Sequence, residues 1–292
     1  MTDPTPQPRL RHVSCLGARG LHRMGYWEWG AADNPRVLVC VHGLSRQGRD
    51  FDTLARDLCD RYRVVCPDVV GRGESDWLAD PAGYQLPAYV ADMVTLLARL
   101  DAEQVDWVGT SMGGLIGLGV AGLAGSPLRR LVLNDVGPTI EWAAVQRIGT
   151  YLGQPVRWPS AQAAADTLWA ISQGFGPHTP EQWLALTRPQ LRPDGDGFKP
   201  HYDPAIAVPF RALTPEATRA GETLLWQAWD ALRLPVLLLR GADSDLLSRA
   251  TADAMCTRGP HALLHEFAGV GHAPTLVQPD QRQVVRDFLL AP

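Results

Sequence analysis

The chain has 292 residues, of which 46% are hydrophobic and 20% are charged, the balance of an ordinary globular protein. Lysine and arginine together number 27 and aspartate and glutamate 31, so the net charge is −4. The basic residues form only short, interrupted clusters, so we expect no nucleic-acid-binding face. Residues 1–12 are polar and no run of eighteen apolar residues occurs. We therefore expect no secretory signal, no membrane span and a cytoplasmic location.

The five cysteines are odd in number and form no C-x-x-C pair. Cys40 and Cys66 lie inside apolar runs, where a cysteine behaves as a small core residue. The spacing favours neither a disulfide framework nor a zinc site, and we expect no bound metal.

Short β-rich runs alternate with longer helical patterns along most of the chain. Residues 36–41 form a continuous apolar run, which is typical of a strand buried on both faces. Proline suits the first turn of a helix, and Pro87 and Pro279 each precede an apolar pattern of helical spacing. This alternation predicts an α/β fold with a mostly parallel, doubly wound sheet. The other expected strands are residues 21–29, 62–66, 105–109, 130–134, 235–240 and 263–267.

The alternation stops after Asn134. Residues 137–234 show no strong strand signal and hold six of the ten tryptophans. Nearly a hundred residues are too many for a loop, so we predict a helical cap inserted into a core of residues 1–136 and 235–292. Most of these tryptophans should pack inside the cap, and some should line a substrate cavity. Residues 192–201 are interpreted as a loop, and the missing third acidic position and terminal glutamate argue against calcium binding there.

Gly109-Thr-Ser111-Met-Gly113 matches the pattern G-x-S-x-G. An expected strand precedes the motif and a helix rich in small residues follows it, as in a strained strand–turn–helix elbow that exposes a nucleophilic serine. We predict Ser111 as the nucleophile and the Met112 amide as an oxyanion donor. A helix-capping serine and a phosphate-binding loop are the alternatives, but no lysine follows the glycines.

A serine hydroxyl needs a neighbouring base, and His272 is our candidate. It follows the last expected strand, at the carboxyl edge of the sheet where Ser111 also lies. We choose Asp245, after the strand at 235–240, as the acid that orients His272, with Asp243 and Asp135 as alternatives. The order serine, aspartate, histidine is that of an α/β hydrolase.

These motifs resemble the α/β-hydrolase superfamily over nearly the whole chain. Val41-His-Gly-Leu44 resembles its oxyanion loop, in which His42 would shape the loop and the Leu44 amide would be the second donor. Pro67–Asp76 resembles the loop after the fourth strand, and the resemblance implies a structural role for Asp68.

Two further motifs resemble a bacterial branch of capped esterases; they are Asn134-Asp-Val-Gly-Pro138 and Ser244-Asp-Leu-Leu247. One departure from the family concerns the acid. The family acid often lies three residues after the glycine of the turn that follows the seventh strand, and here Ser244 occupies that position, with Asp245 one residue further.

The resemblance implies an eight-stranded sheet and a two-step hydrolysis of carboxylic esters, with lactones as a further substrate class, through an acyl-enzyme, without metal or organic cofactor. The serine argues against epoxide hydrolases and haloalkane dehalogenases, which carry an aspartate at the elbow. The tryptophan-rich cap predicts short to medium apolar acyl groups. A carbon–carbon hydrolase using Arg147, Arg157 or Arg188, and a slow-turnover ligand receptor, are the other hypotheses. We expect small-molecule substrates, no nucleic-acid or membrane partner, and a monomer by default.

Overall fold

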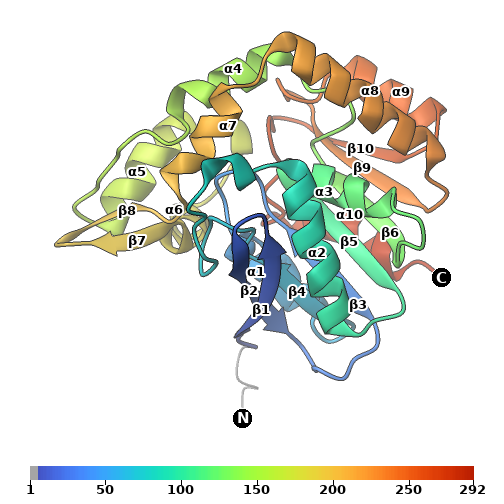
Figure 1. Ribbon diagram of the computed structural model, residues 1–292, viewed down its shortest axis with the longest axis horizontal. Coiled ribbons are helices and arrows are strands. Elements are labelled where there is room, and N and C mark those ends of the chain that lie inside the picture. The colour runs from blue at the N-terminus through green and yellow to red at the C-terminus, as the bar shows by residue number, and fades with distance from the viewer. Residues whose placement is uncertain (1–5) are drawn as a thin grey trace.

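A computed structural model describes residues 6–292 (Figure 1). Eight strands form one sheet in the order β1-β2-β4-β3-β5-β6-β9-β10. The two pairs β1–β2 and β2–β4 are antiparallel and the remaining neighbours are parallel. The predicted mostly parallel, eight-stranded α/β sheet is therefore confirmed. Its strands are β1 Arg9–Gly17, β2 Gly20–Trp29, β3 Val37–Val41, β4 Arg63–Pro67, β5 Val105–Thr110, β6 Leu128–Asn134, β9 Val236–Gly241 and β10 Leu263–Phe267.

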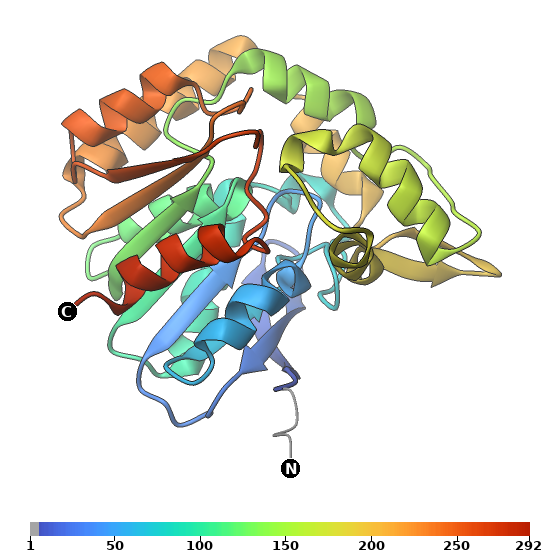
Figure 2. The same ribbon diagram turned by 180° about the vertical axis from the view of Figure 1, so that it is seen from behind.

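Helices cover both faces of the sheet (Figures 1 and 2). Successive residues of a strand point to opposite faces, so the central strands feed two separate apolar clusters. Val39 and Leu133 pack in the cluster that holds Met93, whereas Leu38 and Val132 pack in the cluster that holds Val285. This burial on both sides explains the continuous apolar runs. The helices of the core are α1 Asp52–Leu58, α2 Leu86–Leu100, α3 Met112–Ala121, α9 Arg249–Thr257 and α10 Pro279–Leu290.

The insertion, residues 137–234, connects β6 to β9 and extends over one end of the sheet (Figures 1 and 2). Three of its six tryptophans, Trp158, Trp183 and Trp229, are buried. Because the insertion leaves β6 at its carboxyl end, it lies at the sheet edge where ligands bind in α/β folds. Its helices are α4 Trp142–Tyr151, α5 Ala161–Ile171, α6 Pro180–Thr187, α7 Ala207–Arg211 and α8 Pro215–Ala231.

The insertion also contains a β-hairpin where a loop was expected. β7 (Leu191–Asp194) and β8 (Gly197–Pro200) pair antiparallel around a turn in which Gly195 has φ +59°. The interpretation of residues 192–201 as loop was wrong, because a two-residue turn, Gly195-Asp196, joins two short strands there. Among residues 6–292, no helix has the length and apolar character needed to cross a membrane.

Candidate active site

Ser111 lies at a sharp turn between β5 and α3. Its backbone has φ 51° and ψ −117°, a conformation that side chains rarely adopt and that marks stored strain. Close packing of the turn requires glycine, because a Cβ on Gly113 would lie 1.9 Å from the Val41 carbonyl oxygen. The Ser111 side chain makes no capping hydrogen bond to α3. The geometry is therefore that of the expected elbow and not that of a helix-capping serine.

The side chains of Ser111, His272 and Asp135 form one hydrogen-bonded chain. His272 Nε2 lies 3.0 Å from Ser111 Oγ, and His272 Nδ1 lies 2.7 Å from Asp135 Oδ2. Asp135 is fully buried and the His272 side chain is 13% exposed. Because a carboxylate only accepts, Nδ1 carries the proton and Nε2 offers its lone pair to the serine hydroxyl.

The structure corrects the choice of acid, because it places Asp135 and not Asp245 against His272. The Asp245 side chain is 51% exposed and forms a two-point ion pair with Arg147 of α4, at 2.7 and 3.0 Å. Asp243 is also exposed. The prediction that Asp245 lies against His272 was wrong, because the turn after β9 places Ser244 against Asp135 and leaves Asp243 and Asp245 exposed.

Three groups surround the Asp135 carboxylate. Oδ1 accepts from the Gly241 amide at 2.8 Å, and Oδ2 accepts from Ser244 Oγ at 2.6 Å as well as from His272. Ser244 Oγ itself accepts from the amides of Leu246 and Leu247 at 3.3 and 3.1 Å, so its own proton points at Asp135. Ser244 thus lies where the resemblance places the acid, and it donates a hydrogen bond to Asp135, the residue that follows β6.

Replacing Ser244 by alanine is expected to lower kcat about tenfold with little change in KM, because a hydrogen bond to a charged group contributes about 1.5–3 kcal/mol. Without this hydrogen bond Asp135 should hold His272 less firmly in the orientation that faces Ser111. Steady-state hydrolysis of p-nitrophenyl butyrate measures the effect, and Ser244→Thr, which keeps the hydroxyl, is the matched control. An unchanged kcat in Ser244→Ala would show that the hydroxyl only supports the loop.

Asn134 ties together the loops that carry the three side chains. Its side-chain Nδ2 donates to Thr110 Oγ1 at 2.9 Å and to the Pro274 carbonyl at 2.8 Å. Its backbone carbonyl accepts from the Ser111 amide at 3.0 Å. Buried amide contacts of this kind fix the relative positions of the strand ends. Sequence analysis missed this residue, because a polar residue at a strand end carries no signal of its partners.

The insertion also holds the loop of His272. The Gly271 amide donates to the Gly174 carbonyl at 2.6 Å, and His178 Nε2 lies 2.8 Å from Thr275 Oγ1. Burial lowers the pKa of His178, so it stays neutral near pH 7. The loop that carries the histidine therefore depends on contacts from both the core and the insertion.

The loop after β3 lies beside the elbow. A Cβ on Gly43 would lie 3.8 Å from Ser111 Cβ. Among the described residues, neither the Leu44 amide nor the Met112 amide donates a hydrogen bond to another group of the protein. Two amides without hydrogen-bond acceptors beside a serine hydroxyl could together bind an oxyanion, as in an oxyanion hole.

His42 stabilises this loop as a neutral imidazole. Its Nδ1 donates to the Gly43 carbonyl at 2.7 Å, and its Nε2 accepts from the Val69 amide at 3.0 Å. Complete burial lowers the pKa of His42 to about 3. The buried Asp68 joins the loop after β3 to the loop after β4, since its carboxylate accepts from the amides of Gly48 and Glu74 at 2.6 and 2.9 Å.

The buried His42 is expected to make the protein acid-sensitive. Its pKa is lower in the folded than in the unfolded chain, so its contribution is complete above about pH 6.5 and is lost as pH falls toward 3. Between about pH 7 and 4.5 this should remove about 3 kcal/mol of unfolding free energy. Urea unfolding of wild type and His42→Gln at both pH values measures the difference. An equal acid loss in both proteins would rule out His42 as the source.

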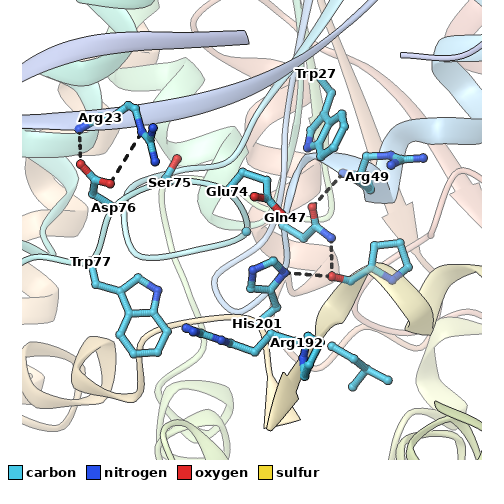
Figure 3. Close-up of a pocket in the computed structure, with 14 residues that line it drawn as sticks. Arg23, Trp27, Gln47, Arg49, Glu74, Ser75, Asp76, Trp77, Arg192 and His201 are labelled. Atoms are coloured by element: carbon cyan, nitrogen blue, oxygen red, sulfur yellow. Dashed lines mark hydrogen bonds and ion pairs between the residues drawn. The ribbon is translucent and has the colours of Figure 1, made fainter. Parts of the chain in front are cut away.

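A cavity of about 650 Å³ lies where the insertion meets the core (Figure 3). Gln47 Nε2 and His201 Nδ1 both donate to the Pro189 carbonyl on its wall, at 2.6 and 3.4 Å. Five of its fourteen lining residues are charged, and none of the three hydrogen-bonded site residues contributes to it. This cavity is therefore not the apolar acyl pocket that we expect, and that pocket stays a prediction.

The sheet order, the serine at the elbow and the histidine loop after β10 are the architecture of an α/β hydrolase. The chain belongs to the alpha/beta hydrolase family, whose sequence model matches residues 38–287. It is 57% identical over 285 residues to the 3-hydroxybutyrate-oligomer hydrolase of Cupriavidus necator, covering 96% of this chain and 97% of that protein.

Two other proteins support the same class. Esterase YbfF of Escherichia coli is 27% identical over 262 residues, which cover 85% of this chain and 90% of that protein. The crystal structure of an alpha/beta hydrolase from Novosphingobium aromaticivorans is 33% identical and superposes with a TM-score of 0.86, covering 98% of this chain and 99% of that one. The family and these relatives support hydrolysis of esters as the class of reaction.

Proposed function

We propose that this protein is a serine hydrolase of carboxylic esters in which Ser111, His272 and Asp135 form the catalytic triad. The observation that carries the proposal is the chain of contacts at 3.0 and 2.7 Å from Ser111 Oγ through His272 to Asp135. The buried carboxylate keeps the imidazole in the tautomer that accepts the serine proton and stabilises the imidazolium that forms.

In the first step Ser111 Oγ bonds to the acyl carbon while its proton passes to His272 Nε2. The carbonyl electron pair moves to the oxygen, where the Leu44 and Met112 amides would hold the oxyanion. His272 then donates its proton to the leaving alkoxide as the ester bond breaks. His272 Nε2 then deprotonates a water molecule, whose oxygen bonds to the acyl carbon. As the bond from that carbon to Ser111 Oγ breaks, His272 returns the proton to Ser111 and the acid leaves. These residues supply every proton transfer in the sequence.

We further propose short oligomers of 3-hydroxybutyrate as the substrate. The proposal is supported by the relative of that name, which is 57% identical over 96% of this chain. Such oligomers are esters of four-carbon acyl units, which agrees with the short acyl groups expected from the tryptophan-rich insertion. We also propose that residues 137–234 act as a cap domain over a core of residues 1–136 and 235–292.

A substrate panel tests both levels of this proposal. We expect turnover of p-nitrophenyl butyrate and of the 3-hydroxybutyrate trimer, with weak activity on long triglycerides. Turnover of the nitrophenyl ester alone would keep the esterase and reject the oligomer. Turnover of neither ester by a folded protein would reject the function.

The carbon–carbon hydrolase hypothesis gains no support from the arginines proposed for it. Arg147 pairs with Asp245, and Arg157 pairs with Asp194 and Asp196 at the surface. Arg188 is exposed. A dienoate ring-cleavage product is the substrate to include in the panel, and we expect no turnover of it.

A further inference from the structure

Arg72 is a fully buried arginine in the loop that follows β4. Among residues 6–292, no carboxylate lies within ion-pair distance of its guanidinium. Tyr84 and Tyr89 present their rings to it at 5.8 and 5.0 Å. The carboxylate of Asp203 reaches it only indirectly, as the acceptor of the Tyr84 hydroxyl at 2.6 Å.

Arg72 contacts both residues whose amides are the expected oxyanion donors. Its Nε donates to the Leu44 carbonyl at 2.8 Å, and its Nη2 lies 3.5 Å from the Met112 sulfur. Its Nη1 donates to the Val70 carbonyl at 2.7 Å and to the Tyr89 hydroxyl at 3.1 Å. One rigid guanidinium therefore bridges the loop after β3 and the start of α3.

This arrangement is costly for stability alone. A buried charge without a counter-ion loses much of its hydration, and well-packed apolar side chains often replace buried ionic groups without loss of stability. The groups that accept hydrogen bonds from Arg72 are neutral, so no neighbouring negative charge neutralises its guanidinium. A fixed cation in such a place is best explained by what it does for a negative charge that forms nearby.

The contacts of Arg72 complete the support of the Leu44 peptide. The Gly43 carbonyl, which belongs to the same peptide plane as the Leu44 amide, accepts from His42 Nδ1 at 2.7 Å and from the Arg46 amide at 3.1 Å. Arg72 holds the carbonyl of the next peptide plane. With both planes fixed, the Leu44 amide is oriented before substrate arrives, which is the condition for strong oxyanion stabilisation.

We propose that Arg72 is a positioning residue for the oxyanion hole, and that it holds the Leu44 segment by its carbonyl, contacts the Met112 side chain and adds a permanent positive charge beside both. The inference rests on the proposed roles of these two amides. It gives a catalytic purpose to a loop that sequence reasoning treats as purely structural. Arg72 does not contact the reacting atoms, so its effect should appear in the transition state and not in substrate binding.

Arg72→Met and Arg72→Lys test this inference with p-nitrophenyl butyrate. We expect kcat of Arg72→Met to fall about 100-fold with KM within about threefold, since loss of one oxyanion donor costs about 10²–10³ in kcat. Arg72→Lys keeps the charge but cannot reach Leu44 and Met112 together, so it should recover only part of the loss.

A transition-state analogue separates positioning from a general structural effect. The matching trifluoromethyl ketone adds Ser111 Oγ at its carbonyl carbon, with the serine proton passing to His272 and an oxyanion formed on the ketone oxygen. Its inhibition constant should rise in the variants by the same factor as kcat/KM falls. The inhibition constant of butyramide, which forms no oxyanion at the site, should stay within threefold.

Arg63→Met is the matched control. Arg63 is another largely buried arginine, bonded to the Leu100 carbonyl and paired with Glu28 at the far end of β4. Its loss should lower stability, leaving kcat within about threefold. If Arg72→Met does not fold, Arg72→Lys decides by the same criteria.

An unchanged kcat in a folded Arg72 variant would overturn the inference. So would a fall in kcat with an unchanged inhibition constant for the trifluoromethyl ketone. A wild-type protein without ester turnover would count against the proposed function instead, and the ketone comparison would still test Arg72.

Discussion

Replacing Asp135 by asparagine is expected to lower kcat about 10⁴-fold, because the amide cannot hold His272 in the tautomer that accepts the serine proton. Replacing Asp245 by asparagine is expected to leave kcat within about threefold. The difference follows from burial and partners: Asp135 is fully buried and bonded to His272, whereas Asp245 is half exposed and bonded to Arg147. Steady-state kinetics on p-nitrophenyl butyrate give both numbers.

Stability measurements guard this comparison. Asp135→Asn leaves the Gly241 amide and the Ser244 hydroxyl with an acceptor of altered geometry, so thermal unfolding should be followed for each variant. Both side chains of the Asp245–Arg147 pair are about half exposed, and exposed pairs contribute about 0–1 kcal/mol. The opposite pattern, with Asp245→Asn inactive and Asp135→Asn active, would mean that the acid of the working enzyme lies after β9.

The central strands were predictable because burial on both faces leaves a strong mark on the sequence. Apolar runs at 36–41, 105–109 and 235–240 correspond to β3, β5 and β9 within one or two residues. The mostly parallel direction of the strands followed from their alternation with helices, because parallel strands require crossover connections. Ser111 was predicted from the G-x-S-x-G motif between a strand and a helix, and His272 from its loop after the last strand at the same carboxyl edge.

The acid was harder to choose because three aspartates follow core strands at the same edge. The sequence does not reveal how the turn after β9 is oriented, and there a difference of one residue decides which side chain faces inward. The structure has Ser244 inward, bonded to Asp135 at 2.6 Å. A serine in the position of the family acid was itself the signal that the carboxylate is supplied by another strand.

The sequence of the β7–β8 hairpin contains a turn signal, but the tryptophan content and the length of the insertion favoured a helical cap. Asp194-Gly195-Asp196-Gly197 is turn chemistry between two short runs, of which only the turn was recognised. Strands of four residues carry too little alternation to be distinguished from loop. The insertion is also held by contacts to distant segments, such as the Gly174–Gly271 hydrogen bond, and these have no local signature.

Loss of the Ser111 hydroxyl is expected to abolish catalysis, with kcat of Ser111→Ala lower by about 10⁵–10⁶. A fluorophosphonate probe should add one adduct to wild type and none to this variant, as seen by intact mass spectrometry. In that reaction the serine oxygen bonds to phosphorus, fluoride leaves, and the serine proton passes to His272 Nε2. His272→Ala should therefore label much more slowly, because nothing else in the chain of contacts accepts that proton.

Ser160→Ala separates this role from that of an ordinary helix-capping serine. Ser160 caps α5 by accepting from the Ala163 amide, whereas Ser111 makes no such bond to α3. Loss of the Ser160 hydroxyl should lower the free energy of unfolding by about 1 kcal/mol and leave the adduct and kcat unchanged. Ser111→Ala should instead keep or raise stability, because a serine strained at φ 51° and held for catalysis contributes little to the fold. Persistent labelling of Ser111→Ala would place the reactive group elsewhere in the protein and would remove the basis of the proposed mechanism.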